Sequence, residues 1–149
     1  MRPRSKRGNA HGAYSPFQEN DCCSNRAQSL IRESAADEIE LARVRRAMDV
    51  FMQQRRPPPH IRSKVDLGFR VIGQSIEIFE IRPPWQGPPD EKHESPIAKA
   101  TYVKSRRVWR VFWQRRDLKW HSYEPEPEVK SVDEFATLVS EDAHACFFG

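Results

Sequence analysis

The sequence predicts an α+β fold, in which a disordered basic leader precedes an N-terminal helix, a five-stranded antiparallel meander sheet and a short C-terminal helix. Apolar residues recur at helical spacing from Leu41 to Met52. They alternate with polar residues in several short stretches between 65 and 123. A capping motif begins a second amphipathic stretch at Ser131. Short connections between the alternating stretches favour an antiparallel sheet with one apolar face, and helices cover such a face.

The leader is predicted to cover residues 1–33 and the single folded domain residues 34–149. The leader is basic and rich in Ser, Asn and Gln, with few aliphatic residues, and such a composition favours disorder. Ser34, with Asp37 three positions on, is a predicted helix N-cap. The prolines at 57–59 end the helix, because proline lacks the N–H that continues it.

The first hairpin is predicted from strands at 65–72 and 76–82. The pair Gly73-Gln74 between them suits a two-residue turn, and the resulting register sets Val71 opposite Ile76. Trp85 follows Arg82-Pro83-Pro84, and we expect it to plug one end of the core instead of remaining exposed.

Two further hairpins are predicted from strands at 97–103, 108–113 and 118–123. The register that keeps charges off the apolar face pairs Val103 with Val108 and Trp113 with Leu118. In this register Trp120 lies on the apolar face. The opposite face is mixed basic and aromatic.

The C-terminal segment is predicted to begin with an acidic, proline-rich exit at 125–128. Ser131 and Glu134 form a capping box for a helix that runs to about Asp142. The adjacent Phe147 and Phe148 are expected to dock on the core.

Charge is unevenly distributed along the 149 residues, although the whole chain is only +4. Residues 97–123 hold eight basic side chains and one acidic, a local charge of +7. Residues 124–149 hold one basic and seven acidic side chains, a local charge of −6. The basic block attracts polyanions. The alternative interpretation is a solvated face that the acidic block neutralises.

The basic–aromatic sheet face is the candidate binding site, because nucleic acids need cations for phosphates and flat side chains for bases. Basic leader residues such as Arg2 and Arg7 would add non-specific attraction. The predicted site residues are Lys99, Arg106, Arg107, Arg110, Phe112, Arg115, Arg116, Lys119, His121 and Tyr123.

We expect a non-enzymatic, cytoplasmic binding module whose partner is DNA, RNA or another polyanion. One alternative is an interaction module for an acidic protein. Another is a small nuclease, either metal-dependent through Glu80 and Asp66 or dependent on His121 beside Arg110. The three cysteines and five histidines lack metal-ligand spacing, and we expect no metal, cofactor or membrane span.

Five short segments resemble an uncharacterised bacterial family, domain-of-unknown-function family 3024, over roughly residues 36–149. They are Arg82-Pro83-Pro84-Trp85, Pro96 to Ala100, Trp109 to Trp113, Trp120 to Tyr123, and Phe147-Phe148-Gly149. The family usually has a Gly- or Asn-containing turn before the Trp-His pair, whereas this chain has Arg115 to Lys119 there. Phe148 stands where Trp is typical. The resemblance implies a small stand-alone bacterial domain and no particular activity.

Overall fold

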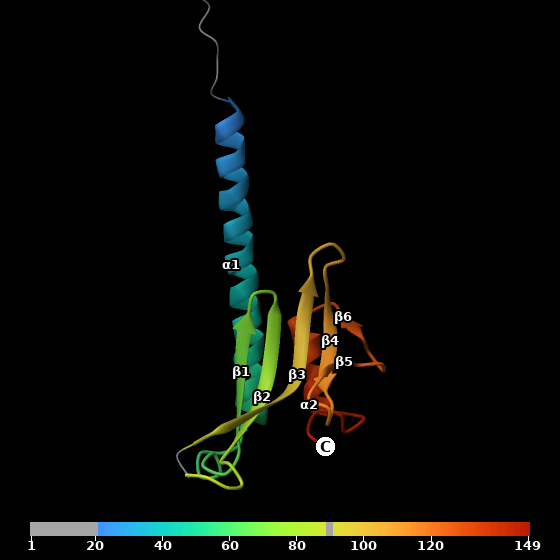
Figure 1. The fold of residues 1–149 in the computed structure, drawn as a ribbon. Coiled ribbons are helices and arrows are strands. Elements are labelled where there is room, and N and C mark those ends of the chain that lie inside the picture. Colours follow the sequence, from blue (N-terminus) through green and yellow to red (C-terminus); the bar gives the residue numbers. More distant parts are fainter. Residues whose placement is uncertain (1–20, 89–90) are drawn as a thin grey trace, which may run out of the picture. The chain divides into compact units, whose positions relative to one another are not determined.

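The fold of the chain is seen in a computed structural model that describes residues 21–88 and 91–149, with side chains from residue 37 onward (Figure 1). The chain separates into two compact units, Met1–Glu38 and Ile39–Gly149. The elements are α1 (Asp21–Arg55), β1 (Asp66–Ile72), β2 (Ser75–Arg82), β3 (His93–Val103), β4 (Val108–Gln114), β5 (Trp120–Ser122), β6 (Glu128–Val129) and α2 (Val132–Glu141). The predicted α+β order is therefore confirmed.

Helix α1 begins at Asp21, earlier than the predicted start at Ser34. A serine N-cap stabilises a helix end, but a helix passes through such a residue when the preceding residues also favour helix. Residues 1–20 of the predicted leader lie outside the described residues, and the division of the chain at residues 33 and 34 stays a prediction.

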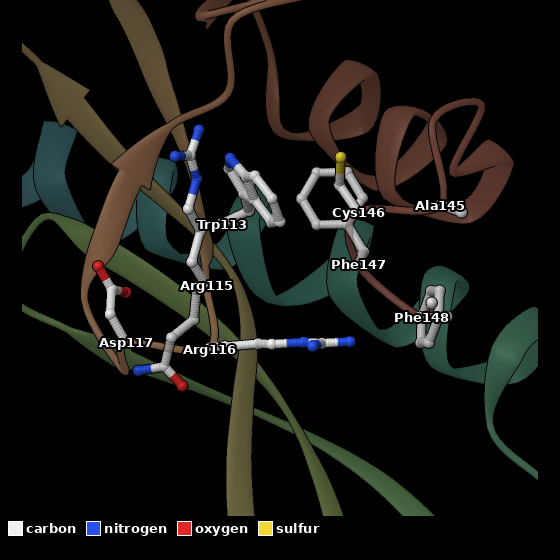
Figure 2. A pocket seen from close by; sticks show the side chains of 10 residues that line it. Trp113, Arg115, Arg116, Asp117, Ala145, Cys146, Phe147 and Phe148 are labelled. Atoms are coloured by element: carbon white, nitrogen blue, oxygen red, sulfur yellow. The ribbon is translucent and has the colours of Figure 1, made fainter.

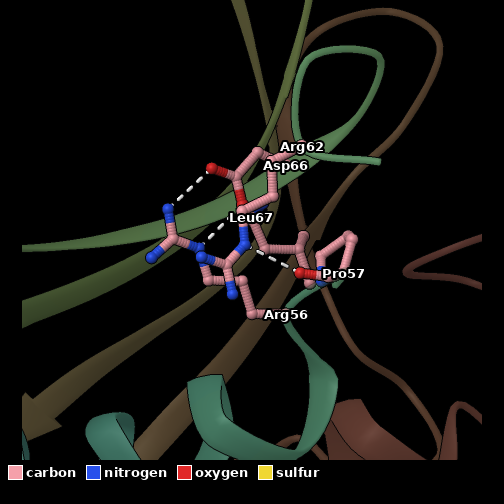
Figure 3. A network of polar contacts seen from close by, with 5 residues as sticks. All are labelled: Arg56, Pro57, Arg62, Asp66 and Leu67. Carbon is pink, nitrogen blue, oxygen red and sulfur yellow. Dashed lines mark hydrogen bonds and ion pairs between the residues drawn. The ribbon is translucent and has the colours of Figure 1, made fainter. Parts of the chain in front are cut away.

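The C-terminal end of α1 is tied to the first strand by an ion pair between Arg56 and Asp66 (Figure 3). The Arg56 guanidinium donates to both Asp66 carboxylate oxygens, over 2.8 and 2.7 Å. Arg62 Nε donates to the Pro57 carbonyl over 2.8 Å and so braces the connection. The hydrogen bond from Arg56 lowers the pKa of Asp66 below its ordinary value. This clamp fixes where β1 enters the sheet.

The sheet has the order β1-β2-β3-β4-β5, and the short strand β6 also pairs with β4. The predicted first hairpin is confirmed: Val71 faces Ile76, and Gly73 takes a positive φ of 57° in the turn. The predicted β3–β4 register is confirmed along its length, from Ala98 opposite Trp113 to Val103 opposite Val108. The sequence predicted five strands and missed β6, a two-residue strand in the acidic exit.

The register of β5 differs from the prediction. Trp113 faces His121 instead of Leu118, because the connection spans the five residues Arg115 to Lys119. Leu118 adopts a left-handed backbone with φ of 58°, and its N–H donates to the Arg115 carbonyl over 2.9 Å. The shift is an odd number of residues, so it exchanges the two faces of β5.

Both helices cover the same face of the sheet. The part of α1 from Ile39 onward contributes Val44, Ala47, Met48 and Phe51 to the core, and α2 contributes Val132, Phe135, Ala136 and Val139. These residues pack on inward-facing sheet residues such as Ile78 and Val111, which have no exposed surface. Among the described residues, no helix contributes to the opposite face, which we call the open face.

The C-terminal tail folds back against the core, as predicted. Ser131 caps α2 by accepting from the Glu134 N–H, and Phe147 is only 4% exposed. The Asp142 carboxylate accepts hydrogen bonds from the backbone N–H groups of the three residues Cys146, Phe147 and Phe148. One side chain therefore bonds three consecutive residues of the tail.

Trp85 is 97% exposed, so its predicted role as a core plug is wrong. It lies in the loop between β2 and β3, outside both strands. The two prolines before it hold the backbone extended as it leaves the sheet, which carries the indole away from the core.

Candidate nucleic-acid interface and a neighbouring cavity

The open face of β3, β4 and β5 carries cations beside aromatic rings. Phe112 and Trp120 are half-buried, and Arg110 is exposed. The Arg110 guanidinium carbon lies 5.3 Å from the centre of the Phe112 ring, and Lys99 Nζ lies 5.5 Å from the centre of the Trp120 ring. Such contacts hold flat side chains and charges together at the surface.

The first three strands present paired charges on this face. Glu77 lies between Arg70 and Lys99, at 3.1 and 3.4 Å, and Glu94 contacts Arg70 at 2.9 Å. Lys99 is thus held between Glu77 and Trp120 with only 25% of its side chain exposed. This half of the open face is close to electrically neutral.

The unpaired cations lie along β4 and in the turns at its two ends. Arg106 forms an ion pair with Glu128. In the described part of the chain, five of the predicted cations make no ion pair with a carboxylate: Arg107, Arg110, Arg115, Arg116 and Lys119. We define the β4–β5 stripe as Arg110, Phe112 and Trp120 on the open face, together with Arg107 and Lys119 in the turns at its two ends. The seven residues of β4 extend for about 20 Å. The stripe is therefore long enough to contact an extended ligand over this distance.

Two residues that were predicted to lie on the open face of the sheet are on the helix-covered side instead. Tyr123 is only 2% exposed, its ring centre lies 5.0 Å from that of Phe147, and burial raises its pKa. His121 lies opposite Trp113 on the helix-covered side, and its Nε2 is 2.8 Å from Asp117 Oδ2. Trp120, which the sequence assigned to the core, takes their place. Neither flanking turn carries a sequence signal strong enough to reveal this exchange.

The residues proposed for a nuclease are not assembled into a site. Glu80 faces Leu67 and pairs with Arg82 at 2.8 Å, whereas Asp66 pairs with Arg56. His121 and Arg110 lie on opposite faces of the sheet, so their predicted partnership is wrong. Within residues 21–88 and 91–149, no group of three or more His, Cys, Asp or Glu residues is arranged to hold a metal ion.

A cavity of about 720 Å³ lies between the β4–β5 turn and the C-terminal tail (Figure 2). Trp113, Arg115 and Arg116 line one side, and Cys146 and Phe148 line the other. The Arg115 side chain runs beside the Trp113 indole, 4.9 Å from the ring centre. Arg116 extends from the turn toward the tail (Figure 2). Burial raises the pKa of the Cys146 thiol, so this sulfur is protonated at neutral pH and is a poor nucleophile.

Comparison with known proteins finds a family model described as "Domain of unknown function (DUF3024)" that matches residues 36–149. No curated protein matches the chain, and no solved structure matches it. No helix within the described part of the chain has the length and apolar character to cross a membrane.

Proposed function

The chain belongs to the DUF3024 family, and from that premise we propose that it is a binding module whose β4–β5 stripe takes a single-stranded nucleic acid. The observation that carries the proposal is that Arg110 lies beside the half-buried rings of Phe112 and Trp120 on the open face of β4 and β5, with further cations in the turns at both ends of β4. Cations attract the phosphates, and flat rings stack on bases.

The aromatic side chains favour a single strand over a duplex. In a duplex the base faces are stacked on one another and only their edges are reachable in the grooves. In a single strand each base offers a free face to a ring such as Phe112 or Trp120. The stripe is also open along its length, because neither helix packs against it.

An acidic protein is the alternative partner. It would be attracted by Arg107, Arg110 and Lys119, but it has no particular need for rings placed between them. The two partners therefore differ in what the rings contribute, and this difference can be measured.

The test is a salt titration of binding, measured by fluorescence anisotropy with a labelled oligonucleotide of mixed sequence. The full chain is used, with the leader residues Arg2, Arg4, Lys6 and Arg7 replaced by Gln in every sample. If three stripe cations contact phosphates, the slope of log affinity against log salt is about −2 for a single strand.

Variants separate the contribution of charge from that of stacking. Arg110→Gln is expected to weaken binding and to reduce the slope by about 0.7. Phe112→Ala is expected to weaken binding about fivefold or more and to leave the slope unchanged, because stacking releases no counterions. Arg45→Gln, which removes an exposed charge from α1 in the helical layer, is the matched control and is expected to change neither.

Two outcomes count against the proposal. The first is an absence of single-strand binding at 50 mM salt. The second is binding that Arg45→Gln weakens as much as Arg110→Gln does, since that would locate the attraction in the overall charge. Loss of binding in Arg110→Gln with no effect of Phe112→Ala would favour the acidic protein.

The proposal includes a bacterial origin and a cytoplasmic location, where nucleic acid is abundant. Fractionation of cells that express the tagged full chain tests the location. Recovery from the membrane or secreted fraction would contradict it.

A further inference from the structure

The cavity beside the β4–β5 turn has the size and the lining of a small-molecule site. Its volume of about 720 Å³ falls within the range of ligand pockets. Its wall combines aromatic surface with two guanidinium groups that make no ion pair with a carboxylate in the described part of the chain. Unpaired arginines at a pocket wall favour an anionic ligand, and planar fork geometry suits phosphate in particular.

The one carboxylate side chain at the cavity wall is already engaged. Asp117 Oδ1 accepts from the Lys119 N–H over 3.0 Å, and Oδ2 contacts His121 Nε2. These two contacts lower the pKa of Asp117, so it stays ionised and bonded within its own turn. Asp117 therefore neutralises neither Arg115, whose guanidinium lies against the Trp113 ring, nor Arg116.

The apolar part of the wall indicates what the anion is attached to. Trp113 is partly buried against the core, and the Arg115 guanidinium carbon lies 4.9 Å from its ring centre. Phe148 is held from the other side, because the Arg55 guanidinium carbon lies 4.8 Å from its ring centre and Asp142 bonds its N–H. Rigid rings facing a common space suit a flat, apolar group.

We propose that this cavity binds a nucleotide through its phosphate and base, with Arg115 and Arg116 on the phosphate and the base against Trp113 and Phe148. The nucleotide is either a free nucleoside monophosphate or the phosphorylated end of a strand that lies on the β4–β5 stripe. The second source rests on the proposed function. The turn that supplies both arginines also supplies Lys119 to the stripe, so the end of a bound strand would reach the cavity by passing around this turn to the helix-covered side.

The first experiment measures the protection of Cys146 from alkylation in the full chain, with Cys22 and Cys23 replaced by Ser so that one thiol remains. Adenosine monophosphate is expected to slow the reaction of Cys146 with iodoacetamide severalfold at pH 8.5, because the thiol lines the cavity. Adenosine without phosphate is the ligand control. Arg116→Gln is expected to raise about tenfold the concentration of adenosine monophosphate that gives half-maximal protection.

The control variant is Arg45→Gln, on α1 in the helical layer. It removes the same charge outside both proposed sites and is expected to leave protection by the monophosphate unchanged. Equal effects of the two variants, or equal protection by adenosine and its monophosphate, would overturn the assignment of the phosphate to Arg115 and Arg116.

The second experiment compares a 5′-phosphorylated oligonucleotide, a 3′-phosphorylated one and an unphosphorylated one. If the ligand is a strand end, one phosphorylated oligonucleotide binds several times more tightly than the unphosphorylated one. Arg116→Gln is then expected to abolish this difference without changing the affinity for the unphosphorylated oligonucleotide. Strand binding without any end effect and without protection by the monophosphate refutes the cavity site and leaves the stripe intact. Protection by the monophosphate without strand binding supports the cavity and refutes the stripe.

Discussion

Asp66 is the one charged side chain that is buried among the described residues, at 8% exposed. Its pKa is lowered in the folded state, chiefly by the hydrogen bond from Arg56. The carboxylate therefore stabilises the fold fully above the ordinary pKa of 3.8, and this stability is lost as pH falls below it toward the folded-state value. We expect Asp66→Asn to lower the free energy of unfolding by about 2 kcal/mol at pH 7, less than for a fully buried pair, because the Arg56 side chain is 40% exposed.

Urea unfolding at a series of pH values checks this prediction. The difference between Asp66→Asn and the unsubstituted chain should be constant from pH 5 to 8 and should shrink in more acidic solution. Glu40→Gln is the control, because Glu40 meets Arg43 in an exposed pair at 3.7 Å whose loss costs little. A difference between Asp66→Asn and the unsubstituted chain that did not depend on pH would contradict an ionic role for Asp66.

Asp142 determines the position of the C-terminal tail. It ends α2 with a left-handed φ of 39° and accepts three backbone N–H groups at 2.8, 3.1 and 2.9 Å. Asp142→Ala removes all three acceptors and is expected to lower the free energy of unfolding by about 2 kcal/mol. Asp142→Asn keeps one carbonyl oxygen and tolerates the left-handed backbone, so it should cost about half as much.

Thermal unfolding measures these two variants, and hydrogen exchange of the Phe147 and Phe148 amides reports on the tail itself. Asp133→Ala, an exposed change in the first turn of α2, is the comparison. Unchanged exchange at both Phe amides in Asp142→Ala would show that packing alone holds the tail.

The turn between β4 and β5 adopts its conformation at a cost in backbone strain. Leu118 is 77% exposed and has a φ of 58°, a conformation that a β-carbon disfavours. Leu118→Gly is expected to raise the free energy of unfolding by about 0.5–1 kcal/mol, the relief of strain being partly offset by the entropy of a glycine in the unfolded chain. Chemical denaturation checks the sign, and a loss of stability would mean that Leu118 makes contacts that outweigh the strain.

This turn also shows why the sequence predicted some pairings and missed others. The β1–β2 and β3–β4 registers followed from alternation, because a slip by one residue would bury charges such as Arg110. On β5 the same argument failed, since both Trp120 and His121 tolerate either face. Leu118 gave no indication of a left-handed residue, whereas a glycine or asparagine at this position would have indicated the five-residue turn.

Within the Ile39–Gly149 unit, the candidate sites include segments whose proximity in the fold could not be predicted from the sequence. Arg110 and Phe112 lie on one predicted strand, so their common face could be anticipated. The cavity lies between the 115–117 turn and the tail at 145–149. The periodicity of apolar residues gives no information about which distant segments lie side by side. The exposed Trp85 was missed for a related reason, because an aromatic residue after two prolines fits a core plug and a surface loop equally well.

The charge blocks of the sequence are only partly neutralised against each other in the fold. Arg106 of the basic block meets Glu128 of the acidic block, and Glu128 also lies opposite Arg110 in the sheet. Glu128→Gln should therefore free one cation and remove one repulsive charge beside the stripe. We expect single-strand affinity to rise about two- to threefold at 50 mM salt, with a smaller gain at 150 mM, where screening is stronger.

Glu141→Gln removes the same charge from the end of α2 in the helical layer and should change affinity little. Anisotropy titrations of both variants measure this difference. Equal gains would show that net charge alone controls binding, whereas a gain confined to Glu128→Gln would locate the ligand along β4.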